Sequence, residues 1–248
     1  MHRQPIPRNN TLADMKKTDF ENRRLRFASY NIFHGGRADY DISKIAKNIT
    51  DNHIDIVGIQ EVDRGTLRSG GIDILKELSD FSGYPYYAFF KTIDYSGGEY
   101  GVAVLSRYPI LSSEKILLKS EGTEQRALGI TQIDIGERRI SFLVTHLTFR
   151  NENARKGQLS QLAEILEKKS EFVLTGDFNT SDLGALDGMR GISRVNRREQ
   201  PTVTFPDGAR CIDNIVYSDS VWSFGEINLV TDSYSDHYMI FADAEFKK

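Results

Sequence analysis

The sequence predicts an α/β fold that combines two β-sheets in one domain, and three observations support this prediction. Short apolar runs bounded by turn residues, at 55–60 and 172–174, are typical of buried strands. Apolar residues recur at helical spacing in two longer stretches, 42–49 and 153–168. Three consecutive stretches between 110 and 145 have the pattern of successive antiparallel strands. No internal repeat, low-complexity segment or linker divides the chain.

The first half of the chain alternates predicted strands and helices. A strand over 25–30 precedes a helix with Asp41 as its N-cap, and the apolar face of that helix consists of Ile42, Ile45, Ala46 and Ile49. A buried strand over 55–60 and a second helix over 72–81 follow. Strands over 86–90 and 101–105 then flank a polar, glycine-bearing loop that contains Glu99.

The second half is richer in strands. Strands are predicted over 110–118, 126–135 and 140–145, with a turn at Gly136 between the last two. The helix over 153–168 has an apolar face made of Leu159, Leu162, Ala163 and Leu166. The segment 181–200 is polar and basic, and it follows the strand that stops at Gly176. The remaining strands are predicted over 203–205, 211–217, 221–230 and 238–246.

Composition limits the classes of function. The chain has 248 residues, 39% hydrophobic and 27% charged, with a net charge of −3, which argues against a general nucleic-acid binder but leaves room for a local basic patch. The single cysteine, Cys211, cannot form an internal disulfide. No run of 18 apolar residues and no signal-peptide core are present, so we expect a cytoplasmic protein without a transmembrane segment. Residues 1–24, in which Lys and Arg outnumber Asp and Glu six to three, are predicted to be a flexible N-terminal arm, with a short helix near 12–20.

A polar side chain repeatedly follows a predicted strand. This happens at Asn31, Glu61, His146, Asp177, Asn179 and Asp236-His237, while Asp213 stands near the start of its own strand. Because such groups are costly to bury without partners, their recurrence at strand ends predicts one shared polar site. The set is rich in oxygen ligands and lacks a cysteine pair, which favours Mg²⁺, Mn²⁺ or Ca²⁺ over zinc or copper.

Asp177 and Asn179 can be interpreted in two ways. On an extended segment, side chains two positions apart point to the same side, so a carboxylate and an amide would face one spot at the end of a buried strand. Gly, Asp and Asn are also ordinary turn residues, and the same stretch could be a strand-to-helix turn.

The order of these motifs resembles the endonuclease/exonuclease/phosphatase superfamily. The matching pieces are Tyr30-Asn31, Gln60-Glu61-Val62, Gly101 to Arg107, Thr145-His146-Leu147, Gly176-Asp177-Phe178-Asn179, Ile212-Asp213-Asn214-Ile215 and Ser235-Asp236-His237. The resemblance covers about residues 25–246 and implies a catalytic domain over 25–248. It implies a deoxyribonuclease I-like fold, a four-layer α/β/β/α sandwich with two mixed β-sheets packed face to face and helices outside. The implied activity is metal-assisted hydrolysis of phosphate esters.

The resemblance also implies roles for individual residues. Glu61 resembles the principal Mg²⁺ ligand, Asn31 the residue beside that metal and the scissile phosphate, and Asp236 a residue near the metal. Asp177 and Asn179 resemble the pair that positions the attacking water and the phosphoryl oxygens.

The histidines receive implied roles as well. His237, oriented by Asp213, resembles the histidine that faces the phosphate. His146 resembles a second active-site histidine, and Glu99 is expected to orient it. Arg126 is either a phosphate contact or part of a structural ion pair. Arginines at 190, 194, 197 and 198 either steer an anionic substrate or belong to a solvated loop.

The predicted function is therefore that of a Mg²⁺-dependent phosphoesterase, in particular a phosphodiesterase, acting as a monomer. A nuclease and a lipid phosphoesterase of the sphingomyelinase or inositol phosphatase kind are alternatives on the enzyme side. A rival of another class is a degenerate binding module, which should have lost a metal ligand or His237, and neither is missing. The sequence leaves the choice of base between Asp177 and His237 open.

Overall fold

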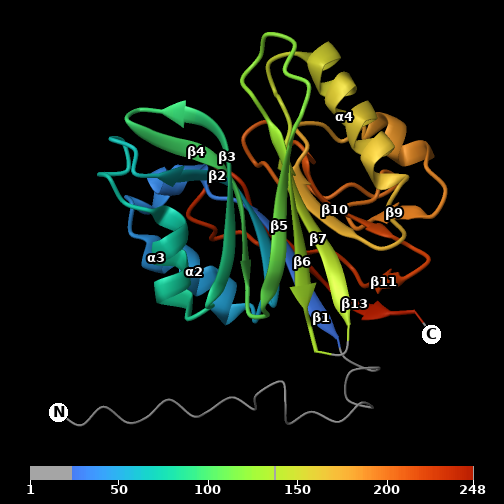
Figure 1. Ribbon diagram of the computed structural model, residues 1–248, viewed down its shortest axis with the longest axis horizontal. Helices are drawn as coiled ribbons and strands as arrows, with labels where there is room; N and C mark the ends of the chain where they lie inside the picture. Colours follow the sequence, from blue (N-terminus) through green and yellow to red (C-terminus); the bar gives the residue numbers. More distant parts are fainter. Residues whose placement is uncertain (1–23, 137, 248) are drawn as a thin grey trace.

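The computed structural model describes residues 24–136 and 138–247, and these form four layers (Figure 1). One sheet has the strand order β11-β13-β1-β2-β4-β3, with β12 paired to β13, and the other has the order β5-β6-β7-β8-β10-β9. We call them the first and the second sheet. Helices α2 (Ile42–Asp51) and α3 (Ile74–Ser82) cover the outside of the first sheet, and α4 (Glu152–Leu166) covers the second. The predicted four-layer sandwich is confirmed.

The strands follow the sequence patterns closely. The first sheet contains β1 (Leu25–Asn31), β2 (Ile56–Arg64), β3 (Tyr86–Tyr95), β4 (Gly98–Ser106), β11 (Trp222–Phe224), β12 (Asn228–Val230) and β13 (Met239–Phe246). The second contains β5 (Ile110–Leu117), β6 (Ala127–Asp134), β7 (Arg139–His146), β8 (Val173–Asp177), β9 (Ile192–Arg194) and β10 (Asp213–Ser218). Each sheet includes one parallel pair, β1 with β2 and β7 with β8, so both sheets are mixed.

The central core lies between the sheets. Phe27 of β1 stacks on Phe142 of β7 with 5.8 Å between ring centroids, and its ring meets that of Trp222 edge-on at 5.4 Å. Gly58 of β2 permits the closest approach, because a Cβ atom at this position would overlap the hydroxyl of Thr175 on β8. The absence of a side chain at Gly58 therefore helps to set the spacing of the two sheets.

Two outer cores attach the helices. The four predicted apolar residues of α2 are all buried, as are the four of α4. Burial of these stripes against the sheets, rather than helix propensity, accounts for most of the stability of such short helices. Asp41 occupies the N-cap position of α2, but its carboxylate accepts a hydrogen bond from the hydroxyl of Ser43 and makes none with the backbone of the first turn.

The structure corrects several predicted boundaries. The expected loop over 91–100 is mostly strand, because β3 and β4 form a hairpin whose turn is Ser96-Gly97, with φ of 47° and 79°. Residues 203–205 form no strand beyond one bridge between Phe205 and Arg210. The predicted strand over 221–230 is divided into β11 and β12, and the basic segment contains the 3-10 helix η3 (Gly184–Gly188) and β9.

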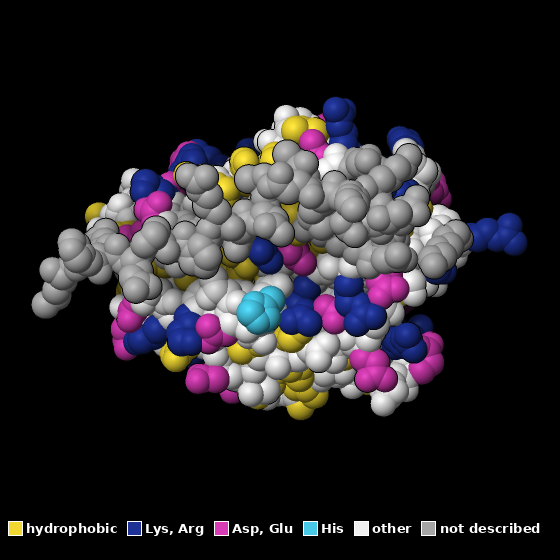
Figure 2. All heavy atoms as spheres, turned by 90° about the horizontal axis from the view of Figure 1, so that it is seen from below, with side chains coloured by type: hydrophobic (Ala, Val, Ile, Leu, Met, Phe, Trp, Pro, Cys, Tyr) yellow, Lys and Arg dark blue, Asp and Glu magenta, His cyan; other side chains and the backbone are white. Residues whose placement is uncertain are grey.

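Two sequence predictions concern the outside of the molecule. The expected N-terminal arm and its short helix lie outside the described residues, apart from Arg24, which pairs with Glu245 at 2.7 Å. None of the helices in the described part of the chain is long and apolar enough to cross a membrane. On the face seen in Figure 2, the side chains that are not covered by grey atoms include positive and negative groups side by side, consistent with the small net charge.

Candidate active site

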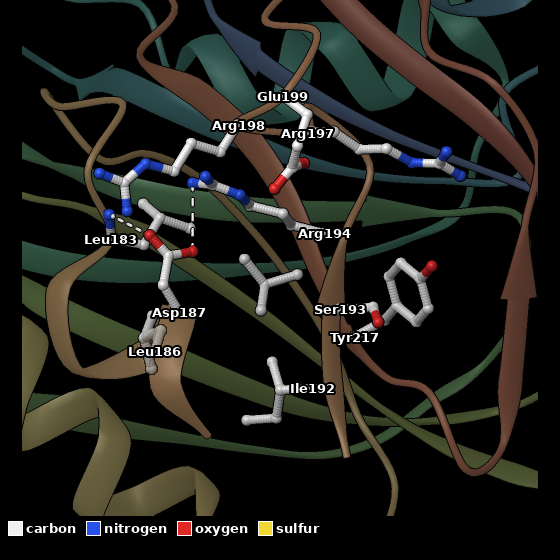
Figure 3. A pocket seen from close by; sticks show the side chains of 11 residues that line it. Leu183, Leu186, Asp187, Ile192, Ser193, Arg194, Arg197, Arg198, Glu199 and Tyr217 are labelled. Carbon is white, nitrogen blue, oxygen red and sulfur yellow. Dashed lines mark hydrogen bonds and ion pairs between the residues drawn. The ribbon is translucent and has the colours of Figure 1, made fainter. Parts of the chain in front are cut away.

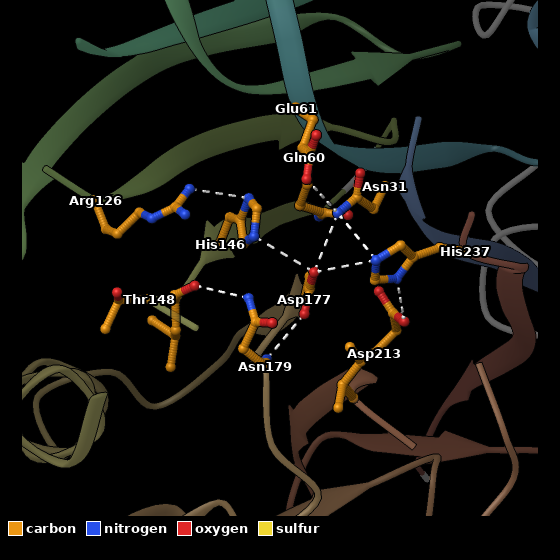
Figure 4. A network of polar contacts seen from close by, with 12 residues as sticks. Asn31, Gln60, Glu61, Arg126, His146, Thr148, Asp177, Asn179, Asp213 and His237 are labelled. Carbon is orange, nitrogen blue, oxygen red and sulfur yellow. Dashed lines mark hydrogen bonds and ion pairs between the residues drawn. The ribbon is translucent and has the colours of Figure 1, made fainter. Parts of the chain in front are cut away.

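Strand pairing brings the predicted polar residues together. In β7 and β8, which run parallel, His146 lies opposite Asp177, and in β8 and β10 Asp177 lies opposite Asp213. Asn31 ends β1 on the facing sheet, and its amide nitrogen lies 3.1 Å from Asp177 Oδ2 (Figure 4). The site thus forms where the carboxyl ends of the two parallel strand pairs meet, the place where open α/β sheets bind ligands.

Glu61 reaches the site from within a strand, whereas the sequence predicted it just past the strand's end. β2 continues to Arg64, and its pairing with β4 shifts between Ile59 and Val62. Glu61 lies in this bulge with φ of 58°. A bulge re-aims the side chain that it carries, and here Glu61 Oε1 accepts a hydrogen bond from Asn31 Nδ2 at 3.2 Å.

Asn31 contacts several of the polar side chains of the site. Its buried amide nitrogen donates to Glu61 and Asp177, and it lies 3.4 Å from His237 Nε2. Its side-chain oxygen accepts the backbone N–H of Phe33 at 3.1 Å, which fixes the orientation of the amide. The backbone carbonyl of Asn31 accepts a hydrogen bond from the Ser235 hydroxyl at 2.7 Å. Asn31 thereby links the first sheet to the segment that carries His237.

Asp177 is a buried carboxylate with four polar neighbours. Its Oδ1 accepts the backbone N–H of Asn179 at 2.8 Å, and its Oδ2 lies 3.4 Å from His146 Nε2 and 3.6 Å from His237 Nε2. Burial, reinforced by the negative charge of Asp213, raises the pKa of Asp177 to about 7 even though His237 and the hydrogen bonds oppose the rise.

His237 and Asp213 form a buried hydrogen-bonded pair. Nδ1 of His237 lies 2.9 Å from Asp213 Oδ2. Burial lowers the pKa of His237, but the charges of Asp213 and Asp177 outweigh it and raise the pKa to about 10. His237 is therefore an imidazolium at neutral pH, with both ring N–H groups as donors. The Phe205 ring packs against the imidazole in a T-shaped arrangement, with 4.8 Å between centroids and 70° between the ring planes.

His146 is held in one tautomer. Its Nδ1 lies 3.1 Å from Nη1 of Arg126, which can only donate, so His146 carries its proton on Nε2 and directs it toward Asp177. Burial, and after it the charge of Arg126, lowers the pKa of His146 well below its usual value. Arg126 also pairs with Glu124 at 3.2 Å. Of the two predicted roles of Arg126, these contacts match the structural one.

The prediction that Glu99 orients His146 is wrong. Glu99 lies opposite Arg64 in the pairing of β2 and β4, and its carboxylate pairs with Arg64 and, at 3.3 Å, with Lys91. The sequence argument failed because it treated 91–100 as a loop, whereas the hairpin commits Glu99 to cross-strand partners. Arg126 occupies the place at His146 that was assigned to Glu99.

Asn179 faces the site for a different reason from the predicted one. Its φ of 54° is left-handed, so Asp177 and Asn179 are not two alternate positions of an extended strand. The backbone N–H of Asn179 closes a turn on Asp177, and its Nδ2 donates to the Leu147 carbonyl at 2.9 Å. Both predicted interpretations therefore hold in part, since a turn presents the amide beside the carboxylate.

The donor set fits a hard divalent cation. Two carboxylates, Glu61 and Asp177, share a single amide donor, and burial raises the pKa of both. The charge of Asp236 adds to the rise at Glu61. Oδ1 of Asp213 is buried and has no hydrogen-bond partner among the residues that the structure describes. Ligand atoms of Asp177, Asp213 and His237 lie within 4.8 Å of one another. The site thus concentrates oxygen atoms and negative charge that a divalent ion would compensate.

Two residues of the site were not identified from the sequence. The buried hydroxyl of Thr204 accepts the backbone N–H of Asp213 at 3.1 Å, and its carbonyl accepts that of Tyr238 at 2.8 Å. Phe205 contacts His237 as described above. Both were predicted as part of a short strand. They lie 32 or more positions before His237 in the chain, and nothing in their local sequence indicates that they contact the site.

Comparisons with known proteins agree on the fold. The model of the endonuclease/exonuclease/phosphatase family matches residues 28–237. Among solved structures, an endonuclease/exonuclease/phosphatase from Beutenbergia cavernae DSM 12333 has a TM-score of 0.76 at 20% identity, covering 90% of this chain and 72% of that one. D. rerio TDP2 complexed with single strand DNA product has a TM-score of 0.68 at 18% identity (90% and 99%). A mannosyl-6-phosphatase from Bacteroides thetaiotaomicron VPI-5482 has a TM-score of 0.68 at 19% identity (90% and 100%).

Proposed function

The chain belongs to the endonuclease/exonuclease/phosphatase family and is an enzyme of the phosphoesterase class, and we propose that it hydrolyses phosphodiesters with the help of Mg²⁺, or of Mn²⁺ or Ca²⁺. The observation that carries the proposal is the convergence of Asn31, Glu61, Asp177, Asp213 and His237 from both sheets. Two buried carboxylates around one amide are unusual in a purely structural ion pair. A site that uses a metal ion to hydrolyse a phosphate ester, by contrast, needs such a group of oxygen ligands.

Glu61 and Asn31, with Asp236 beside them, are the residues that we expect to hold the ion. His237 is a poorer candidate because its Nδ1 is already bound to Asp213. When bound, the ion would neutralise the anionic phosphate and stabilise charge on the leaving oxygen.

The protein's own groups suit in-line attack by water. Asp177 is the group that we expect to orient the water and accept its proton, because its Oδ2 faces the centre of the site and its other oxygen is fixed by Asn179. His237, held as a cation between two carboxylates, would donate to a phosphoryl oxygen as negative charge grows there. The second N–H of the Asn179 amide and the Nε2–H of His146 are further donors for the same phosphate.

This proposed division of labour selects one of the two candidate bases, Asp177 and His237, that the sequence left open. An imidazole that lies between the carboxylates of Asp213 and Asp177 keeps both of its protons, so it acts as a donor. Asp177 is then the better base. The retention of all these groups also disfavours the degenerate binding module.

The experiment is a substrate panel with a matched set of variants. Bis(p-nitrophenyl) phosphate, DNA, RNA, a phospholipid and inositol phosphates are incubated with the protein and Mg²⁺, Mn²⁺ or Ca²⁺. We expect hydrolysis of at least one diester, and a loss of about 10²–10⁴-fold in kcat for Asp177→Ala and for His237→Ala. Asp207→Ala, at an exposed carboxylate, is the control that should stay active. An inactive wild type, or full activity of both site variants, would refute the proposal.

A further inference from the structure

Asp213 begins β10 at a point that the neighbouring strand β9 does not reach. In the antiparallel pairing of β8 with β10, the bond next to Asp213 joins the backbone N–H of Phe178 to the carbonyl of Ile212 at 2.8 Å. The N–H and carbonyl groups of Asp213 therefore point away from β8, because such groups alternate in direction along an antiparallel strand. On that side, β9 pairs with β10 from Val216 to Ser218 and has ended before it reaches Asp213.

Two buried side chains bind these backbone groups instead of a strand. Thr204 Oγ1 accepts the backbone N–H of Asp213 at 3.1 Å, and Asn196 Nδ2 donates to the Asp213 carbonyl at 3.2 Å. Thr204 is fully buried, and 4% of Asn196 is exposed. Since the partners are side chains, single substitutions can remove either hydrogen bond without changing a strand.

Both side chains are held in place by other contacts. Asn196 Nδ2 also donates to the Thr202 carbonyl at 2.9 Å, and Asn196 Oδ1 accepts the backbone N–H of Thr202 at 2.9 Å. The side chain of Asn214 bonds both backbone groups of Asn196, at 3.0 and 2.9 Å. The backbone N–H of Thr204 donates to the Arg210 carbonyl at 3.0 Å. The two side chains are therefore rigid partners for Asp213.

Thr204 is connected to the histidine side of the pair as well. Its carbonyl accepts the backbone N–H of Tyr238, one residue beyond His237, at 2.8 Å. The following residue, Phe205, packs its ring against the imidazole. Thr204 thus binds the backbone on both sides of the 2.9 Å contact between His237 Nδ1 and Asp213 Oδ2.

We propose that Thr204 and Asn196 are positioning residues, which hold the backbone of Asp213 so that its carboxylate keeps His237 directed at Asp177. The inference rests on the proposed function, in which His237 donates to a phosphoryl oxygen. Oδ1 of Asp213 has no hydrogen-bond partner in the described part of the chain, so the contact at Oδ2 alone orients the carboxylate and the backbone supplies the remaining constraint. A displacement of about 1 Å in such a group can lower a rate about 10²-fold.

The first experiment compares variants of similar shape by steady-state kinetics with bis(p-nitrophenyl) phosphate and Mg²⁺. Thr204→Val removes the hydroxyl, and we expect kcat to fall at least about 10-fold while KM stays within about 2-fold. Thr204→Ser keeps the hydroxyl and should recover most of kcat. Asn196→Asp replaces the Nδ2 donor by an oxygen and should also lower kcat, which tests the proposal even if Thr204→Val does not fold.

Two controls separate positioning from a general loss of stability. Thr131→Val removes another fully buried hydroxyl, which donates to the Phe142 carbonyl at 2.8 Å, and should keep kcat within about 2-fold although it costs stability. Arg198→Ala changes an exposed side chain two residues beyond Asn196, in the wall of a cavity of about 420 Å³ (Figure 3), and should keep kcat as well. Equal kcat values in Thr204→Val and Thr131→Val would overturn the proposal.

A second readout needs neither metal nor substrate. The proton between His237 Nδ1 and the buried carboxylate of Asp213 should resonate at low field in the proton NMR spectrum and be absent in His237→Gln. Thr204→Val and Asn196→Asp should shift this resonance upfield or abolish it, whereas Thr131→Val should leave it in place.

The two readouts separate failure of this inference from failure of the proposed function. An unshifted resonance in both Thr204→Val and Asn196→Asp would overturn the inference even in an active enzyme. A wild type that hydrolyses no diester, combined with the expected shift, would defeat the proposed function and leave the positioning of Asp213 supported.

Discussion

The buried carboxylate of Asp177 predicts how the stability of the metal-free protein depends on pH. Its pKa is about 7 in the folded state and has an ordinary value of 3.8 when the chain is unfolded. Between these values the folded state binds one proton more than the unfolded state, so the free energy of unfolding falls as pH rises. One proton corresponds to about 1.4 kcal/mol per pH unit, or about 3 kcal/mol between pH 4.5 and 6.5 as an upper limit.

The comparison that isolates this effect is the wild type against Asp177→Asn, which cannot titrate. Other carboxyl groups change stability in both proteins, so the difference between the two curves measures Asp177. From pH 4.5 to 6.5 we expect the free energy of unfolding of the wild type to fall by about 1–3 kcal/mol more than that of the variant. This expectation does not depend on which of the two proteins is more stable at the starting pH. The pKa of His237 is about 10, so its own contribution is lost only at higher pH.

Urea unfolding in EDTA at pH 4.5, 5.5 and 6.5 provides the measurement. Trp222, the single tryptophan, is fully buried and stacks on Phe246 with 4.1 Å between centroids, so its fluorescence reports the opening of the central core. Parallel curves for the two proteins would refute the reasoning, because they would mean that Asp177 is ionised in the folded state as easily as in the unfolded one. A relative gain for the wild type as pH rises would refute it too.

Three further predictions test individual contacts. Glu61→Gln should raise the Mg²⁺ concentration for half-maximal activity at least about 10-fold, measured by metal titration, whereas Glu99→Gln should not change it. Phe205→Leu should lower kcat about 10-fold with little change in KM, because the ring that packs on His237 is lost, and Phe205→Tyr should keep most of the activity. Gly58→Ala should lower the free energy of unfolding by about 1–3 kcal/mol in urea, because its Cβ would overlap a threonine hydroxyl of β8.

Each of these predictions has an outcome that contradicts it. An unchanged metal requirement in Glu61→Gln would remove Glu61 from the ion site. Wild-type kcat in Phe205→Leu would mean that the ring does not position His237. Wild-type stability in Gly58→Ala would mean that the two sheets can separate locally at no cost, contrary to the density of protein interiors.

Periodicity predicted the main helices and buried strands but not the connections, and the four-layer arrangement was predicted from the family resemblance. The apolar stripes of α2 and α4 and the buried runs of β2 and β8 are local patterns, and each predicted its element correctly. The β3-β4 hairpin was missed because its strands are half-exposed near the turn and its polar residues read as a loop. Ser96-Gly97 was the available signal, as a two-residue turn that tolerates positive φ.

The sequence predicted which residues lie in the site more fully than how the fold places them there. Polar residues at strand ends identified Asn31, Asp177 and His146, since a strand's end is visible in its sequence. Glu61 was placed past a strand that in fact continues, because a bulge depends on the pairing with β4 and leaves no mark in one strand alone. Glu99 was assigned to His146 because its actual partners lie on neighbouring strands, and they cannot be recognised until the pairing register of those strands is known.

The site is a property of the interface between the sheets, and this explains why no single segment encodes it. Asn31 and Glu61 belong to the first sheet and Asp177 to the second, yet the amide of Asn31 lies 3.1 Å from one carboxylate and 3.2 Å from the other. Such distances hold only if the apolar core beneath fixes the spacing of the sheets, which Gly58 helps to set by lacking a side chain. Packing remote from the site would therefore affect the proposed chemistry, since a displacement of about 1 Å between the sheets would separate the groups that we expect to hold the ion from the group that we expect to orient the water.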